Sequence, residues 1–109
     1  IEESAEKAII ENYKSNPQIL QANILKVAHH GSKTSSTSEF IKRVNPQYAL
    51  IGVGKNNTFG HPSDLTIDNL NKFGVKIYRT DECGEITIKT NGRDISLYKN
   101  NKTVNNNKK

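Results

Sequence analysis

Three segments of the chain carry apolar residues at the spacing of one helix face, which predicts amphipathic helices. They are residues 2–15, 36–44 and 63–73. Three short runs of almost continuous apolar residues alternate with these segments, and such runs are typical of strands that are covered on both faces. They are residues 24–28, 48–53 and 75–78. The alternation predicts an α/β fold, a layered sheet with helices on one face.

Polar residues and a glycine at the segment ends predict where two of the helices begin or end. Ser36 and Glu39 have the spacing of a capping box, in which both side chains bind backbone amides at the start of a helix. Ser63 is a suitable first residue for the third helix. Gly74 follows the last apolar residue of that helix, at a position where glycine commonly ends one.

Residues 85–98 have the pattern of a β-hairpin around Asn91 and Gly92. An Asn-Gly pair between two strands favours a turn of two residues. In the register of that turn, four apolar residues would form cross-strand pairs on one face of the hairpin. The pairs are Ile86 with Leu97 and Ile88 with Ile95.

The runs at 24–28 and 48–53 are apolar throughout, so both faces of the predicted sheet need a cover. Helices account for one face. We therefore expect the second face to pack against polypeptide outside this sequence or against a second copy of the chain, as a homodimer. The start at Ile1 and the absence of methionine likewise suggest a piece of a larger protein.

With 109 residues the chain is long enough for one small domain, which we place at residues 1–98 as part of a larger domain. Residues 99–109 form a tail rich in Asn and Lys, which we expect to be disordered. The tail contains four of the 16 Lys and Arg residues and no acidic residue, so the net charge of +5 belongs largely to it. This distribution argues against DNA binding by the folded part.

Cysteine content and hydropathy exclude two further classes of protein. Cys83 is the single cysteine, so neither an internal disulfide nor a metal site built from cysteines alone can form. No apolar run approaches the ~18 residues that suggest a transmembrane helix. We expect this segment to make no contact with a membrane.

The candidate chemistry begins where the first predicted strand ends, at His29, His30, Gly31 and Ser32. Side chains at a strand end are held by the sheet and still face an open edge, which suits a metal ligand or an acid and base. A short motif of this kind is equally typical of a solvated turn. The motif alone leaves both interpretations open.

Three separated stretches together resemble the C-terminal half of the metallo-β-lactamase-like hydrolase domain of ComEC-type competence proteins. They read LKVAHHGSKTSS, NPQYALIGVGKNNTFGHPS and GVKIYRTDECGEI, and they occur in the family's order. The resemblance runs from residue 1 to about residue 88, and the opening IEESAEKAII is similar to the helix that follows a metal-binding Gly-Asp in that family. It implies the C-terminal half of an αββα sandwich.

The resemblance also implies roles for individual residues. It assigns a divalent metal, Zn or Mn, to His29, with His30 as the alternative ligand, and it makes His61 a general acid for the leaving group. Ser32 and Ser35 would donate hydrogen bonds to a phosphate oxygen, although turn and helix-cap chemistry is an alternative role for both, and more so for Ser35.

A last element of the resemblance is the YRTD stretch, for which we expect a structural role. Arg79 and Asp81 would tie the end of a strand to neighbouring loops. Cys83 follows in a turn and is expected to be a surface thiol without a catalytic role.

The function implied is that of a metal-dependent hydrolase of phosphodiester bonds, related to DNA uptake. The family's His-x-His-x-Asp-His loop does not occur in this sequence, so we expect the chain alone to be inactive. Activity would need the N-terminal half of the domain as partner, and the substrate would be DNA or another phosphodiester. The alternative is a non-catalytic half-domain that binds a partner or has a structural role. The location of the parent protein stays open between a membrane-attached and an extracellular one.

Overall fold

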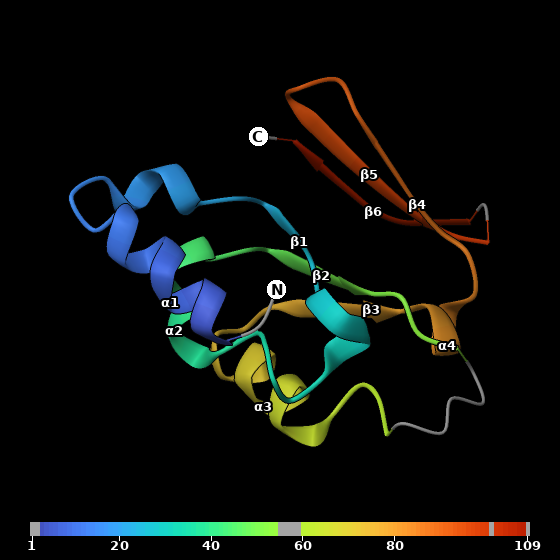
Figure 1. Ribbon diagram of the computed structural model, residues 1–109. Coiled ribbons are helices and arrows are strands. Elements are labelled where there is room, and N and C mark those ends of the chain that lie inside the picture. Colours follow the sequence, from blue (N-terminus) through green and yellow to red (C-terminus); the bar gives the residue numbers. More distant parts are fainter. Residues whose placement is uncertain (1–2, 55–59, 101, 109) are drawn as a thin grey trace.

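A parallel sheet of three strands lies at the centre of the computed structural model, which describes residues 3–54, 60–100 and 102–108 (Figure 1). The strands are β1 (Ile24–Lys26), β2 (Tyr48–Ile51) and β3 (Lys76–Arg79), and they lie side by side in chain order. In the shared register Leu25 is opposite Ala49, which is opposite Ile77. The predicted strands are therefore present. β1 and β2 are slightly shorter than their apolar runs, and β3 is shifted by one residue.

Three helices accompany these strands, one before β1 and one in each of the two connections. They are α1 (Glu3–Asn12), α2 (Ser38–Val44) and α3 (Asp64–Lys72). Residues of α2 and α3 form one hydrophobic cluster with the sheet, and α1 packs against α2. The cluster includes Ile41 and Leu70 from the helices and Ala49 and Ile51 from β2, all without exposed surface. The predicted α/β fold with helices on one face of the sheet is confirmed.

The start of α2 differs from the predicted capping box. Thr37 is the N-cap, and its hydroxyl accepts a hydrogen bond from the backbone amide of Phe40. Ser36 instead takes a left-handed backbone conformation with φ 57° and is buried. The spacing predicted the helix correctly but placed its cap one residue early, because the amides of Ser36 and Thr37 bind a distant side chain that local patterns do not reveal.

Both ends of α3 are as predicted. Ser63 is the N-cap, and its hydroxyl accepts a hydrogen bond from the amide of Thr66. Phe73 ends the helix, and Gly74 follows with φ 70°, a conformation that a glycine adopts without steric cost. Capping chemistry here depends only on neighbours in the sequence, so the sequence alone was sufficient.

A second, antiparallel sheet follows the single turn of helix α4 (Thr80–Cys83). Its strands are β4 (Ile86–Thr90), β5 (Asp94–Lys99) and β6 (Lys102–Lys108). The predicted hairpin of β4 and β5 is present, but its turn is longer than two residues and the register is shifted by two. Ile88 lies opposite Leu97, and Ile95 lies opposite Thr90.

The longer turn has a local cause. The side-chain oxygen of Asn91 accepts hydrogen bonds from the amides of Arg93 and Asp94, and the Thr90 hydroxyl accepts one from Gly92. These side-chain bonds take up the amides that a tight two-residue turn would commit to the strands. A shift of two residues leaves every side chain on its original face, so the four apolar residues of the hairpin still share one face.

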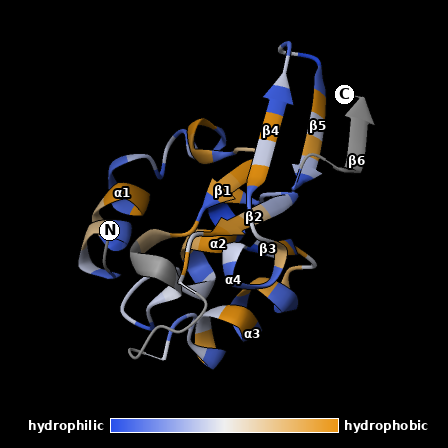
Figure 2. Ribbon diagram, turned by 90° about the vertical axis from the view of Figure 1, so that its right-hand side faces the viewer, coloured by the Kyte–Doolittle hydropathy of each residue, from blue (hydrophilic) through white to orange (hydrophobic). Residues whose placement is uncertain are grey.

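The antiparallel sheet stands on the side of the parallel sheet away from α2 and α3 (Figures 1 and 2). Ala49 and Ile51 belong to the cluster with the helices, so Tyr48 lies on the opposite face of β2. Tyr48 is only 1% exposed, and Leu97 of β5 is fully buried. Figure 2 shows the hydrophobic strands β1 and β2 between the helices and the hairpin of β4 and β5. The chain thus covers part of the second sheet face, for which we had expected outside polypeptide.

Residues 102–108, which we expected to be part of a disordered tail, form strand β6 beside β5. An outer strand can be added there because the edge of β5 presents unpaired backbone groups, which bind a further strand whatever its side chains are. The boundaries of the two predicted domains stay a prediction. Within the described ranges, no helix has the length and apolar character needed to cross a membrane.

Candidate functional site

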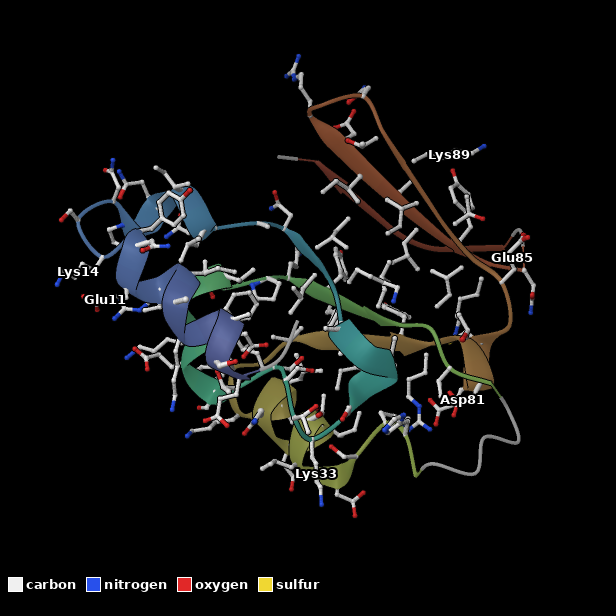
Figure 3. All side chains as sticks on the ribbon, in the orientation of Figure 1. Glu11, Lys14, Lys33, Asp81, Glu85 and Lys89 are labelled. Atoms are coloured by element: carbon white, nitrogen blue, oxygen red, sulfur yellow. The ribbon has the colours of Figure 1, made fainter. Side chains whose placement is uncertain are left out.

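The three stretches that carried the family resemblance meet at the carboxyl ends of the parallel strands. β1 is followed at once by a 3-10 turn, η2 (Ala28–Gly31), which contains His29 and His30. β2 leads into the loop that ends at His61, and β3 leads into α4 with Asp81 (Figure 3). Ligands of α/β proteins commonly bind at this edge of a parallel sheet.

The η2 turn and the loop after β2 touch each other directly. Gly31 has φ 82°, and a Cβ atom at this position would lie 2.5 Å from the Cβ of Pro62. The carbonyl of Gly31 also accepts a hydrogen bond of 2.8 Å from the amide of Ser63. Only glycine permits this approach, so the two histidine-bearing segments are held together at Gly31 and Pro62.

The loop of residues 32–37, which follows the η2 turn, is fixed on one side by α1. The carboxylate of Glu6 is 1% exposed and accepts hydrogen bonds from the amides of Ser36, at 2.5 Å, and Thr37, at 2.9 Å. The amide of Glu3 donates to the carbonyl of Thr34. A buried carboxylate with two backbone donors is a well-satisfied group that holds the loop in one conformation.

One face of α3 fixes the same loop on its other side. Three α3 side chains, each three residues after the last, bind successive positions of the loop and of the start of α2. Thr66 Oγ1 lies 3.1 Å from the Ser32 carbonyl, Asn69 Nδ2 lies 3.2 Å from the Ser36 carbonyl, and Lys72 Nζ lies 3.5 Å from the Ser38 hydroxyl. Residues three apart lie on one face of a helix, so α3 runs alongside the loop.

The third strand end is joined to the second by Thr80. Its hydroxyl accepts a hydrogen bond from the amide of Val53, at 2.8 Å, and donates one to the carbonyl of the same residue, at 2.9 Å. We had expected Arg79 and Asp81 to make this connection. Their side chains instead bind each other, so the link between strand ends belongs to the residue between them.

Arg79 and Asp81 form a two-pronged ion pair, with nitrogen to oxygen distances of 3.0 and 2.6 Å. The hydrogen bonds from Arg79 lower the pKa of the Asp81 carboxyl, and the same contact raises the pKa of Arg79. Glu82 adds a weaker contact to Arg79 at 3.6 Å. The pair keeps the first residues of α4 in place at the edge of the candidate site (Figure 3).

The structure places the sequence-predicted residues unevenly. His61 is partly exposed beside Pro62, whereas the side chains of His29 and His30 lie outside the part that the structure describes. The hydroxyl of Ser32 is 3.0 Å from that of Thr34. Ser35 is 3% exposed, and its hydroxyl lies 3.5 Å from the carbonyls of Ala28 and Ser32, which is the geometry of the turn role that we had weighed for it.

The donors of this edge suit a transition metal only as part of a larger set. Imidazole is a ligand for Zn²⁺ and similar ions, but a catalytic zinc needs three protein ligands. Among the side chains that the structure describes, no three His, Cys, Asp or Glu residues lie close enough together to hold one ion. The described side chains thus do not supply three protein ligands to one ion.

Sequence reasoning missed two residues of this edge, Glu6 and Thr80. Glu6 lies one turn before Ile9 and Ile10, so its burial could have been suspected from the apolar face of α1. Thr80 carries no comparable signal, because its partner Val53 is 27 residues away and becomes visible only in the fold.

Comparisons with known proteins find similar segments in several proteins. The chain is 39% identical over 74 residues to ComE operon protein 3 of Bacillus subtilis, 31% identical over 86 residues to competence protein ComA of Neisseria gonorrhoeae, and 34% identical over 88 residues to the uncharacterized protein YcaI of Escherichia coli. The similar segments cover 68%, 79% and 81% of this chain. No family model matches, and no solved structure matches.

The similar segments correspond to 10%, 12% and 11% of the three relatives, so the chain spans about a tenth of their length. Two of the three carry competence names. The similarity supports a competence-protein family for this chain.

Proposed function

We propose that the chain is the C-terminal part of a metal-dependent phosphodiesterase of the metallo-β-lactamase type that acts on DNA during uptake. The observation that carries the proposal is the contact between Gly31 and Pro62, because it joins the turn of His29 to the loop of His61 at the carboxyl edge of the sheet. The competence names of the relatives support DNA as the substrate.

In this proposal each candidate residue of the chain has a separate role. His29, or His30 in its place, provides one ligand of the metal, Zn or Mn. His61 donates a proton to the leaving oxygen, a task that suits an imidazole because its ordinary pKa lies near neutral pH. Ser32, which is partly exposed, donates a hydrogen bond to a phosphate oxygen. Ser35 stabilises the turn through its contacts with backbone carbonyls.

The remaining ligands come from the segment that the resemblance assigns to the N-terminal half of the domain. When bound, a divalent metal would polarise the phosphate and lower the pKa of an attacking water. The chain by itself offers too few ligands for that chemistry. We therefore expect hydrolysis from the complete domain and none from the 109 residues alone.

The test uses the full-length parent protein with added Mn²⁺ or Zn²⁺. We expect cleavage of DNA and of bis-p-nitrophenyl phosphate, and loss of both bound metal and activity in His29→Ala. His30→Ala is the matched variant that decides between the two adjacent ligands. The proposal fails if the full-length protein leaves both substrates intact and if neither variant changes the metal content.

The role of His61 has its own readout. Loss of a general acid slows reactions of poor leaving groups, by about 10²- to 10⁴-fold, more than those of good ones. His61→Ala is expected to slow cleavage of DNA strongly, to slow that of the p-nitrophenyl ester little, and to leave the metal content unchanged. An equal loss on both substrates would contradict a general-acid role.

A further inference from the structure

Three cationic side chains, two adjacent ones on α2 and a distant one at the end of α3, line one hollow between the two helices. The hollow has a volume of about 480 Å³ and is lined by Ser38, Glu39, Lys42, Arg43, Lys72 and Phe73. From the sequence, the distribution of charge argued against DNA binding by the folded part. It did not reveal this cluster, because Lys72 is 29 or more positions from the basic pair on α2. The fold brings them together by packing α2 beside α3.

The charges of the hollow do not cancel. Glu39 is its single carboxylate and lies 3.7 Å from Arg43. Lys72 is 3.5 Å from the neutral hydroxyl of Ser38 and stands over the ring of Phe73, 5.7 Å from its centre. The lining thus has an excess of positive charge beside an aromatic ring, a combination that binds phosphate groups and the bases next to them.

The position of the hollow relates it to the candidate site. Along α3, Thr66 contacts Ser32 next to the η2 turn, and Lys72 contacts Ser38 at the rim of the hollow. Six residues of helix separate Thr66 from Lys72, which is about 9 Å at 1.5 Å per residue. Lys33, the residue after Ser32, is exposed and points outward beside α3 (Figure 3).

We propose that this basic hollow binds the phosphate backbone of the DNA strand whose cleavage is proposed above. The bound part of the strand lies beyond Lys33, away from the scissile bond. The inference rests on the proposed function for the choice of ligand and adds to it the path of the strand. A strand held at the η2 turn passes Lys33 and reaches Lys42, Arg43 and Lys72 within a few nucleotides. Arginine suits this position because its planar guanidinium matches a phosphate with two hydrogen bonds.

The experiment measures binding of a fluorescent single-stranded oligodeoxynucleotide to the whole 109-residue chain, with EDTA present so that no strand is cut. The test variant is K42Q/R43Q/K72Q. The matched control is K7Q/K14Q/K89Q, which removes the same charge from exposed lysines of α1, of the turn after it and of β4. The basic tail is retained in all proteins, so its contribution to binding is equal throughout.

We expect the test variant to bind about 10-fold or more weakly at about 50 mM salt and the control to bind less than about 3-fold more weakly. The slope of log affinity against log salt should fall by about 2 in the test variant, because three phosphate contacts to a single strand account for about 0.7 each. Glu39→Gln removes the opposing charge and should tighten binding.

Three outcomes would overturn the inference. One is equal affinity of the test and control variants, and another is no binding by the unmodified chain at the lower salt. The third is displacement of the oligonucleotide by inorganic phosphate or polyglutamate beyond the effect of matched potassium chloride, which would assign the hollow to free phosphate or to an acidic peptide. Binding is measured without metal and without cleavage, so a failure of hydrolysis by the full-length protein would leave this result interpretable.

Discussion

The carboxylate of Glu6 on α1 accepts a hydrogen bond of 2.5 Å from the backbone amide of Ser36, thirty residues further along the chain. Ser36 has φ 57°, a left-handed conformation that non-glycine residues seldom adopt. The Glu6 contact and the bond from Asn69 to the Ser36 carbonyl compensate for this conformation from two sides. The loop beside the candidate site is therefore held by residues that are remote in sequence.

Glu6→Gln should lower the free energy of unfolding by about 1–3 kcal/mol, the usual cost of leaving a buried hydrogen-bonding group without its partner. The amide keeps one acceptor but turns its NH₂ group toward a backbone donor. Urea unfolding measures the change. Glu11→Gln is the control, because Glu11 makes an exposed ion pair with Lys14 and should change stability by less than about 0.5 kcal/mol. Equal effects of the two variants would contradict the structural role of Glu6.

Gly31→Ala should separate the η2 turn from the loop of His61. The added Cβ meets Pro62 at 2.5 Å, and the left-handed backbone alone costs an alanine about 1–2 kcal/mol. Gly74→Ala is a close control, since Gly74 also has a positive φ, of 70°, but no atom within 4 Å of the added Cβ. Thermal or urea unfolding should show the larger loss for Gly31→Ala, and similar losses would mean that the contact with Pro62 adds nothing.

Local patterns were enough for those parts of the fold whose causes are local. Ser63 and Gly74 bound α3 as predicted, because the cap of a helix depends on residues within four positions of it. The predicted start of α2 and the predicted hairpin register were wrong, because side chains there competed for backbone amides. Glu6 displaced the cap from Ser36, and Asn91 lengthened the turn.

The candidate site was predictable to a smaller extent. The motifs around His29 and His61 could be singled out from their residue types, and the strand order explains why they meet at one edge. The contacts that hold this edge could not be predicted, because they join segments about thirty residues apart. These contacts are Gly31 with Pro62 and Thr80 with Val53. Such pairs leave no periodic signal in a single sequence.

Thr80→Val should destabilise the junction of the second and third strand ends by about 1–3 kcal/mol. Valine has nearly the shape of threonine, but it leaves the amide and the carbonyl of Val53 without the hydroxyl that now binds both. Thr80→Ser keeps the hydroxyl and is the control. Urea unfolding of the three proteins decides the matter, and the role of the hydroxyl is excluded if serine and valine cost the same.

The ion pair of Arg79 and Asp81 should make stability depend on pH in the acid range. Because hydrogen bonds from Arg79 lower the pKa of Asp81 in the folded state, the unfolded chain binds a proton more readily than the folded one. The stabilising contribution is thus fully present above the ordinary carboxyl pKa of about 3.9 and is lost as the pH falls through the lower pKa of the folded state.

Asp81→Asn should therefore unfold more readily than the unmodified chain at pH 5–7 and about equally at the lowest pH at which both still fold. Urea unfolding across this pH range measures the difference. Asp68→Asn, on the exposed side of α3, is the control and should show little difference at any pH. Arg79→Gln should give the same pH profile as Asp81→Asn, and adding the second substitution to the first should cost little more, because each one already breaks the pair. A difference between Asp81→Asn and the unmodified chain that stays constant down to low pH would show that the contribution of Asp81 does not come from its charge.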